Sequence, residues 1–443
     1  MADLSVNFAG IKAPNPFWLA SAPPTNSGYQ IMKAFEAGWG GAVWKTLGLP
    51  VINVSSRYGA TNYGNNRMAG FNNIELISDR PLIDNLKEME EVKKYFPDHA
   101  VIASLMVESR EDWIQIIKDV ENAGADGIEL NFGCPHGMCE RGMGSAVGQE
   151  PEVLKTIVEW VMEVANIPVI TKLSPNISQI TDPGLAAAQG GTDALSLVNT
   201  FKSIVGIDLD SYAPYPVVDG KGTNGGYCGP AVKPIALNMV KELAQHEQIK
   251  HLPISGIGGI ETWRDVVEFI LLGATSVQVC TAAMHYGFGI VREMQTGLEK
   301  FMDDRGYETI YDFAGKALPN VTEWKHLNLS YQVKANINKD KCVGCDLCYI
   351  ACDDGAHQAI ALHEGSRIPD IIEENCVGCN LCSLVCPVED CITMVEKENE
   401  NKPITWHERS ENNTIPSTFN DDRAGGKGHY VPKPTDALKF KSK

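Results

Sequence analysis

The stretch GIELNFGCPHGM, residues 127–138, leads from a hydrophobic run into a turn that carries Asn131, Cys134 and His136. Glycine and proline together end a strand, so Cys134 follows directly after a strand end. Seven further β-rich runs with nearly continuous apolar sequence surround it: FWLASA (17–22), GAVWKTL (41–47), AVIASLMV (100–107), PVITKLS (168–174), ALSLVNT (194–200), LPISGIGG (252–259) and SVQVCTA (276–282).

The segments between these runs have helical patterns, such as SREDWIQIIKDVENAGA (109–125) and EPEVLKTIVEWVMEVAN (150–166). Continuous apolar strands are typical of a parallel sheet that is covered on both faces. Eight strands that alternate with helices predict an α/β fold, a (β/α)8 TIM barrel. A doubly wound open sheet is the alternative that the pattern leaves open.

Most of the predicted strands end on polar or small residues, which favours the barrel because its strand ends converge on one face. Two of these residues are lysines, Lys45 and Lys172. An unpaired lysine inside a barrel mouth is costly, so we expect a bound anion or an electron-rich ring to offset the cost. The long loops 51–80, 135–149 and 201–234 are rich in Gly or Asn, and we expect them to be functional. Gly142 and Gly144 flank Met143 as candidate hinges of a lid.

Composition excludes several classes of protein. The 443-residue chain carries a net charge of −18, which argues against nucleic-acid binding. No apolar run reaches the ~18 residues that would span a membrane. The N-terminus does not resemble a secretory signal, so we expect a cytoplasmic protein.

Eight of the 13 cysteines form two similar runs, CVGCDLCYIAC and CVGCNLCSLVCP. Both have the bacterial ferredoxin spacing, in which the fourth cysteine of each run ligates the other cluster. We therefore assign one [4Fe–4S] cluster to Cys342, Cys345, Cys348 and Cys386, and the second to Cys376, Cys379, Cys382 and Cys352. A zinc ribbon is the competing interpretation. Cys391 is left over, and we expect it to be a buried thiol.

The predicted division places a barrel at residues 1–310, a connector at 311–334, a small α+β ferredoxin-like domain with the two clusters at 335–397, and an extended or disordered tail at 398–443. Iron–sulfur clusters pass single electrons whereas most organic substrates take two, so the barrel should hold a flavin. GIGGI (256–260) and CTA (280–282) lie where barrels bind a phosphate. FMN fits better than FAD, because the sequence contains no Rossmann half and no NAD(P) fingerprint.

These motifs together carry a family resemblance. ASAPPT (20–25), NIELIS (73–78), ELNFGCPHGMCERGMGSAVGQ (129–149) and KLSPN (172–176) resemble the FMN-and-pyrimidine domain of the dihydropyrimidine dehydrogenases. The doubled cysteine run is similar to the ferredoxin domain of the same family, and the whole resembles its bacterial catalytic subunit. The barrel resembles the dihydroorotate dehydrogenases more distantly.

The resemblance implies a role for each matching residue. Cys134 would be the general acid. FMN would be bound by Ala20, Ser21, Lys45, Thr46, Lys172, Gly229, Gly258, Gly259, Cys280 and Thr281. The pyrimidine would be bound by Asn73, Glu75, Ile77, Asn131, Asn199 and Thr200. Asparagine amides both donate and accept hydrogen bonds, as the carbonyls and N–H groups of uracil require.

The reaction implied is the reversible reduction of the C5=C6 bond of uracil or thymine, with hydride delivered to C6 and a proton from Cys134 to C5. NADH would supply electrons through a partner subunit that holds FAD and NAD, in a heterotetramer, and this chain would form a homodimer. Two departures from the family pattern are Gly133, where relatives have Ser, and Cys139 in the loop. A dihydroorotate dehydrogenase and a simple electron carrier are the alternatives.

Overall fold

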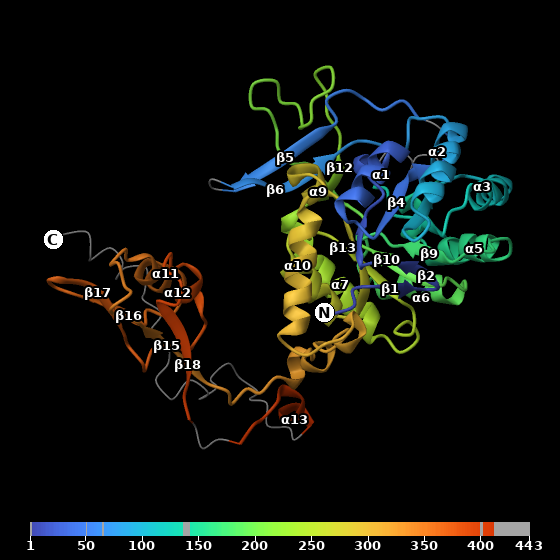
Figure 1. Ribbon diagram of the computed structural model, residues 1–443. Helices are drawn as coiled ribbons and strands as arrows, with labels where there is room; N and C mark the ends of the chain where they lie inside the picture. Colours follow the sequence, from blue (N-terminus) through green and yellow to red (C-terminus); the bar gives the residue numbers. More distant parts are fainter. Residues whose placement is uncertain (1, 50, 64–65, 136–141, 399–401, 412–443) are drawn as a thin grey trace. The chain divides into compact units, whose positions relative to one another are not determined.

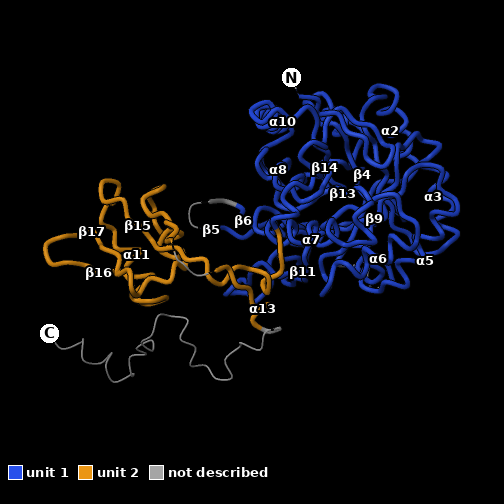
Figure 2. Tube along the Cα trace, turned by 90° about the horizontal axis from the view of Figure 1, so that it is seen from below, with its two compact units in different colours: residues 1–320 blue, residues 321–443 orange. Residues whose placement is uncertain are grey.

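The computed structural model describes residues 2–49, 51–63, 66–135, 142–398 and 402–411. Its contacts divide the chain into two compact units, residues 1–320 and 321–443 (Figure 2). Residues 311–320, which we expected in a connector, lie in the first unit, where Phe313 is fully buried and Gly315 N donates to Ile270 O. The finer boundaries at 334 and 397 remain predictions.

The first unit is a closed barrel, and all eight predicted strands form it. They are β3 (Phe17–Leu19), β4 (Gly41–Leu47), β7 (Ala100–Leu105), β8 (Gly127–Asn131), β9 (Val169–Lys172), β10 (Ala194–Leu197), β13 (Ile254–Ile257) and β14 (Ala274–Val279). Every neighbouring pair is parallel, and β9 pairs with β10 to complete the order β10-β13-β14-β3-β4-β7-β8-β9. The barrel prediction is confirmed, and an open doubly wound sheet is excluded.

Helices follow the strands and cover the barrel (Figure 1). They are α1 (Gly28–Ala37), α2 (Leu82–Tyr95), α3 (Arg110–Asn122), α5 (Pro151–Met162), α6 (Thr181–Gln189), α7 (Lys233–Gln245), α8 (Trp263–Leu271) and α10 (Ile290–Asp303), with the short α4 (Ser145–Gly148), α9 (Thr281–Tyr286), η1 (Pro23–Thr25), η3 (Pro230–Val232), η4 (Ile310–Asp312) and η5 (Leu318–Asn320). Helix α3 shows why these segments fold locally. Ser109 caps its first turn by accepting from Asp112 N, and Trp113, Ile116 and Val120 form its buried stripe.

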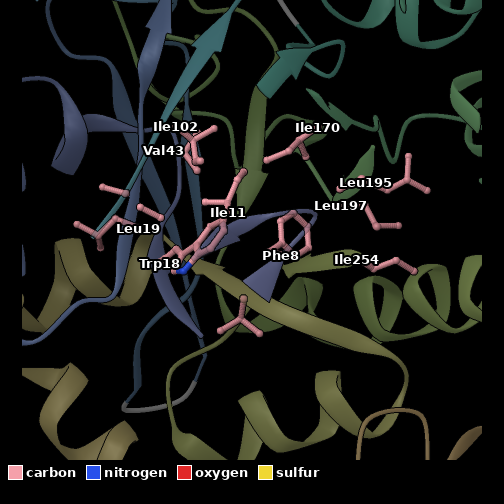
Figure 3. Packing of buried hydrophobic residues seen from close by; sticks show 14 of the residues in the cluster. Phe8, Ile11, Trp18, Leu19, Val43, Ile102, Ile170, Leu195, Leu197 and Ile254 are labelled. Atoms are coloured by element: carbon pink, nitrogen blue, oxygen red, sulfur yellow. The ribbon is translucent and has the colours of Figure 1, made fainter. Parts of the chain in front are cut away.

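The hairpin of β1 (Val6–Phe8) and β2 (Ile11–Ala13) closes the end of the barrel at which the strands begin. A side chain at Gly127, the first residue of β8, would collide with Ile11. Phe8 packs edge-on against Trp18, with ring centroids 5.4 Å apart, among aliphatic side chains of the barrel strands (Figure 3). Because this end is sealed, the opposite end is left for a ligand.

Two segments that we expected to be loops, 51–80 and 201–234, contain strands. They are β5 (Tyr58–Tyr63), β6 (Asn66–Asn73), β11 (Phe201–Ser203) and β12 (Gly225–Cys228). They form an antiparallel sheet in the order β11-β12-β6-β5, called the rim sheet below. The loop interpretation was wrong because β6 pairs with β12, in which Phe71 opposes Cys228, and such distant pairing leaves no local signal in Asn- and Gly-rich sequence.

The second unit has a ferredoxin-like core, as predicted. It contains η6 (Trp324–His326), β15 (Val333–Ile337), α11 (Leu347–Gly355), β16 (Ile360–His363), β17 (Ser366–Ile371), α12 (Leu381–Leu384), β18 (Ile392–Glu396) and α13 (Trp406–Glu411). Strands β15 and β18 pair antiparallel, as do β16 and β17. Helix α13 lies within the expected tail, and residues 412–443 of that tail lie outside the described residues.

Candidate active site

A cavity opens at the carboxyl ends of the barrel strands, beside the rim sheet. It encloses about 1140 Å³, counted out to its open mouth. The structure brings all the residues predicted to act in catalysis or to bind flavin or pyrimidine to its walls: Ala20, Ser21, Lys45, Thr46, Asn73, Glu75, Ile77, Asn131, Cys134, Lys172, Asn199, Thr200, Gly229, Gly258, Gly259, Cys280 and Thr281. Their shared location is an observation, and their individual roles remain predictions.

A chain of hydroxyl and amide groups crosses this end of the barrel. Ser21 Oγ lies 3.1 Å from Thr46 Oγ1, which accepts a hydrogen bond from Asn131 Nδ2 at 2.9 Å. Asn199 Nδ2 in turn donates to Asn131 Oδ1 at 2.9 Å. Each amide is thereby held in one orientation, so its remaining donor and acceptor atoms are fixed before a ligand arrives.

Lys45, the first of the two lysines in the cavity wall, is paired with a carboxylate. Lys45 Nζ lies 2.6 Å from Glu75 Oε1, and Arg57 contacts the same oxygen at 3.0 Å. Tyr58 donates its hydroxyl hydrogen to Glu75 Oε2 at 2.7 Å. Burial, and then this hydrogen bond, raise the pKa of Tyr58 well above its usual range. Glu75 therefore joins a barrel strand to β5 of the rim sheet.

Lys172, the second of these lysines, is also paired with a carboxylate, which lies inside the barrel. Lys172 Nζ lies 3.2 Å from Glu129 Oε1, and Glu129 is fully buried inside the barrel. Glu129 Oε2 accepts hydrogen bonds from Ser196 Oγ and Gln278 Nε2, both at 2.9 Å. Both lysines have carboxylate partners that are distant in sequence, so the premise that they are unpaired was wrong. Whether an anion or an electron-rich ring also contacts them stays a prediction.

Cys134 lines the cavity just beyond the end of β8 and is half-buried. Its backbone oxygen accepts from Ser145 N at 3.0 Å, which fixes the turn against the start of α4. A side chain on Gly133 would lie 2.3 Å from Asn199 Cβ, so the departure from Ser at this position leaves room for Asn199. Met143 is buried against Ile77 and Met106. His136 and Cys139 lie outside the described residues.

Sequence reasoning missed several residues of the site. Glu129, Gln278, Tyr58, Arg57 and Cys228 were not assigned, because only the fold brings them beside the predicted set. Burial raises the pKa of the Cys228 thiol to about 11, although Thr281 Oγ1 donates to its sulfur at 3.2 Å. Burial also raises the pKa of Cys280 far above its usual range. Both thiols therefore stay protonated at neutral pH.

The cysteine runs of the second unit line two separate cavities. Cys342, Cys345, Cys348 and Cys386 line one, and Cys352, Cys376, Cys379 and Cys382 line the other. Each cavity thus takes three thiols from one run and the fourth from the other run. Cys391, which is 2% exposed, is buried as expected and lies in the wall of the first cavity. Within the described ranges, no three His, Cys, Asp or Glu side chains converge on a point that would suit a single metal ion.

Comparison with known proteins agrees with this architecture. The sequence model of the dihydroorotate dehydrogenase family matches residues 3–302, and that of the 4Fe-4S dicluster domain matches residues 335–394. The chain belongs to the dihydroorotate dehydrogenase family. It is an oxidoreductase with a flavin-binding barrel and an iron–sulfur domain.

Three relatives place the chain within this family. It is 43% identical over 368 residues to the NAD-dependent dihydropyrimidine dehydrogenase subunit PreA of Escherichia coli (strain K12), which covers 83% of this chain and 89% of that protein. It is 43% identical over 352 residues to the chloroplastic dihydropyrimidine dehydrogenase (NADP(+)) of Arabidopsis thaliana, and this match covers 76% of this chain and 82% of that protein. It is 36% identical over 326 residues to the dihydroorotate dehydrogenase B (NAD(+)) catalytic subunit of Thermococcus kodakarensis, and this match covers 72% of this chain and 99% of that protein. The resemblance to dihydropyrimidine dehydrogenases is confirmed.

The residues present suit these cofactors. Gly258 and Gly259 line the cavity and have φ of +129° and +70°, and a side chain on Gly259 would lie 2.7 Å from Lys233 Cβ, so this turn requires glycine. A glycine turn in the cavity wall suits a phosphate that is bound by backbone N–H groups. Four thiols around each small cavity form the donor set that iron–sulfur clusters require.

None of the described helices combines the length and apolar character needed to cross a bilayer.

Proposed function

We propose that this chain is the catalytic subunit of a dihydropyrimidine dehydrogenase, which reversibly reduces the C5=C6 bond of uracil or thymine. One observation carries the proposal. Three asparagines, Asn73, Asn131 and Asn199, line the same cavity as Cys134 and the two paired lysines. Fixed amides suit a neutral ring that bears both carbonyl and N–H groups, and a nearby thiol suits the delivery of a proton.

The predicted roles are retained within this proposal. FMN would be held by Ala20, Ser21, Lys45, Thr46, Lys172, Gly229, Gly258, Gly259, Cys280 and Thr281, and the pyrimidine by Asn73, Glu75, Ile77, Asn131, Asn199 and Thr200. Bound FMN would supply hydride for C6 of the pyrimidine. Cys134 then gives its Sγ proton to C5, and the amides hold the ring so that C5 faces the thiol.

Electrons would reach the barrel through two [4Fe–4S] clusters. The cavity membership of the cysteines supports the crossed assignment, with Cys342, Cys345, Cys348 and Cys386 on one cluster and Cys352, Cys376, Cys379 and Cys382 on the other. NADH would deliver the electrons to FAD on a partner flavoprotein subunit. We propose a heterotetramer built on a homodimer of this chain, in the cytoplasm, where thiols at this spacing stay reduced.

The decisive test supplies dithionite to the holoprotein and offers uracil, thymine and orotate in parallel. Uracil and thymine should be consumed, and orotate should not. Turnover of orotate alone would instead favour a dihydroorotate dehydrogenase, the more distant relative. Rapid reduction of uracil by NADH without any partner protein would contradict the proposed second subunit.

The assignment of Cys134 is tested against Cys139. Cys134→Ala should lower kcat by about 100-fold or more, as expected when a general acid is removed, with reduction of the bound flavin by dithionite unchanged. Cys139→Ala is the matched control and should retain turnover. Loss of turnover in Cys139→Ala alone would overturn the choice of Cys134.

A further inference from the structure

The two cysteine runs begin with loops that differ at a single residue. Residues 342–348 read CVGCDLC, and residues 376–382 read CVGCNLC. The backbone is also the same at the position that differs. Asp346 has φ of +61° and ψ of +2° directly before α11, and Asn380 has φ of +68° and ψ of 0° directly before α12. The two loops are therefore distinguished by one negative charge.

The two residues belong to different cavities of the second unit. The first cavity is lined by Cys342, Cys345, Cys348 and Cys386, and the second by Cys352, Cys376, Cys379 and Cys382. Asp346 directly follows Cys345 and lines the first cavity. Asn380 directly follows Cys379 and lines the second cavity. Among the described residues that line either cavity, Asp346 is the only one that carries a carboxylate.

The charge of Asp346 is only partly compensated. Its Oδ1 atom is buried and accepts no hydrogen bond within the described part of the chain. Its Oδ2 atom lies 3.9 Å from Arg367 Nη2, and the side chain of Arg367 is 79% exposed. A long ion pair with an exposed partner contributes little. Because Oδ1 is shielded from water, the field of this carboxylate is screened less than that of a surface side chain.

The second cavity receives positive charge and a hydrogen-bond donor instead. Lys334 Nζ donates to the backbone oxygen of Cys376, which places a cation beside one ligand. Ala359 N donates to Cys352 Sγ at 3.3 Å. Cations and N–H groups that face ligand sulfurs stabilise the more negative, reduced form of a cluster. These contacts therefore act in the same direction as the replacement of a carboxylate by an amide.

The exposed carboxylates do not distinguish the two cavities. Asp353 and Asp354 follow the last cysteine of the first run, which lines the second cavity. Glu389 and Asp390 follow the last cysteine of the second run, which lines the first cavity. All four side chains are exposed, so each cavity has two such solvated charges nearby.

We propose that Asp346 holds the cluster of the first cavity at a lower reduction potential than the cluster of the second cavity, where Asn380 is its neutral counterpart. The inference rests on the proposed function, which places a [4Fe–4S] cluster in each cavity. An added electron makes a cluster more negative, so a neighbouring carboxylate disfavours it and a neutral amide does not. Asp346 thereby favours the second cavity as the place where a single electron resides.

The test is a redox titration of the anaerobic full chain with its clusters, followed by electron paramagnetic resonance. The unaltered protein should show two separate midpoint potentials. Asp346→Asn should raise the lower one and leave the higher one in place, because it removes the charge at the first cavity. At a given applied potential, the ratio of reduced to oxidised first cluster should rise by about threefold to tenfold. Asn380→Asp should lower the higher midpoint by a similar factor.

Glu364→Gln is the matched control. It removes an exposed carboxylate from the turn between β16 and β17 of the same unit, and both midpoints should stay unchanged. Two clusters with equal midpoints in the unaltered protein would overturn the inference alone, as would an Asp346→Asn variant with neither midpoint moved. Spin quantitation that finds fewer than two clusters in the unaltered protein would instead contradict the proposed function, and the inference with it.

Discussion

The two lysines of the cavity have the same chemistry but different supports. Lys172 is paired with Glu129, whose other partners, Ser196 and Gln278, also lie on barrel strands. Lys45 is paired with Glu75, which follows β6 of the rim sheet and also binds Arg57, whose side chain is 30% exposed. The Lys172–Glu129 pair, called the floor pair below, belongs to the closed floor of the cavity. The Lys45–Glu75 pair, called the wall pair below, belongs to a wall that reaches solvent. We therefore expect the floor pair to control stability and the wall pair to control substrate binding.

The largest effect is expected at the floor. Glu129→Ala leaves the Lys172 ammonium buried without a carboxylate, which should lower the free energy of unfolding by about 3–5 kcal/mol. Urea unfolding of the anaerobic protein, followed by tryptophan fluorescence, measures the change. An unfolding midpoint equal to that of the unaltered protein would show that the floor pair does not stabilise the barrel.

A smaller loss of stability is expected at the wall, together with a loss of activity. Glu75→Gln removes the charge that pairs Lys45 and Arg57, and Arg57 can turn to solvent, so we expect a loss of about 1.5–3 kcal/mol of stability. Because Glu75 is predicted to bind the pyrimidine, kcat/KM for uracil should fall by about tenfold to 100-fold. A variant with unchanged kcat/KM would remove Glu75 from the proposed substrate site.

Tyr58→Phe tests how the wall depends on pH. The protonated phenol is favoured in the folded state, so its contribution is complete below the unfolded pKa of about 10 and is lost as pH rises through the raised folded pKa. The unaltered protein should be more stable than Tyr58→Phe by about 1 kcal/mol from pH 7 to 9, and the gap should narrow above about pH 10. Cys228 is present in both proteins, so its titration cancels in the comparison. A stability difference between the two proteins that widens at alkaline pH would contradict the assignment of the Tyr58 hydroxyl as the hydrogen-bond donor to Glu75.

The smallest effect is expected for Arg57→Met. The side chain is partly exposed, and surface ion pairs contribute about 0–1 kcal/mol. Added salt should reduce the difference between this variant and the unaltered protein, whereas the effect of Glu129→Ala should be insensitive to salt. A salt-independent loss in Arg57→Met would place that residue with the floor rather than the wall.

The sequence by itself determined the barrel, the cysteine runs and the predicted set of cavity residues. Apolar runs define strands, fixed spacing defines cluster ligands, and polar residues at strand ends must meet once a barrel closes. The full set of cavity residues, which includes Asn73, Glu75, Ile77 and Gly229, was implied by the family resemblance. The eight strands lie where the runs predicted, although most are shorter because the turns take their last residues.

Only the tertiary structure decided which charged residues form ion pairs and which distant strands pair in a sheet. Glu129 gave no signal within the hydrophobic run GIELN, yet closure of the barrel places it against Lys172 and Gln278. The rim sheet was missed for the same reason, since β6 and β12 are distant in sequence. Ion pairs and sheet pairing depend on distances in space, and these are set by the closed barrel rather than by neighbouring residues.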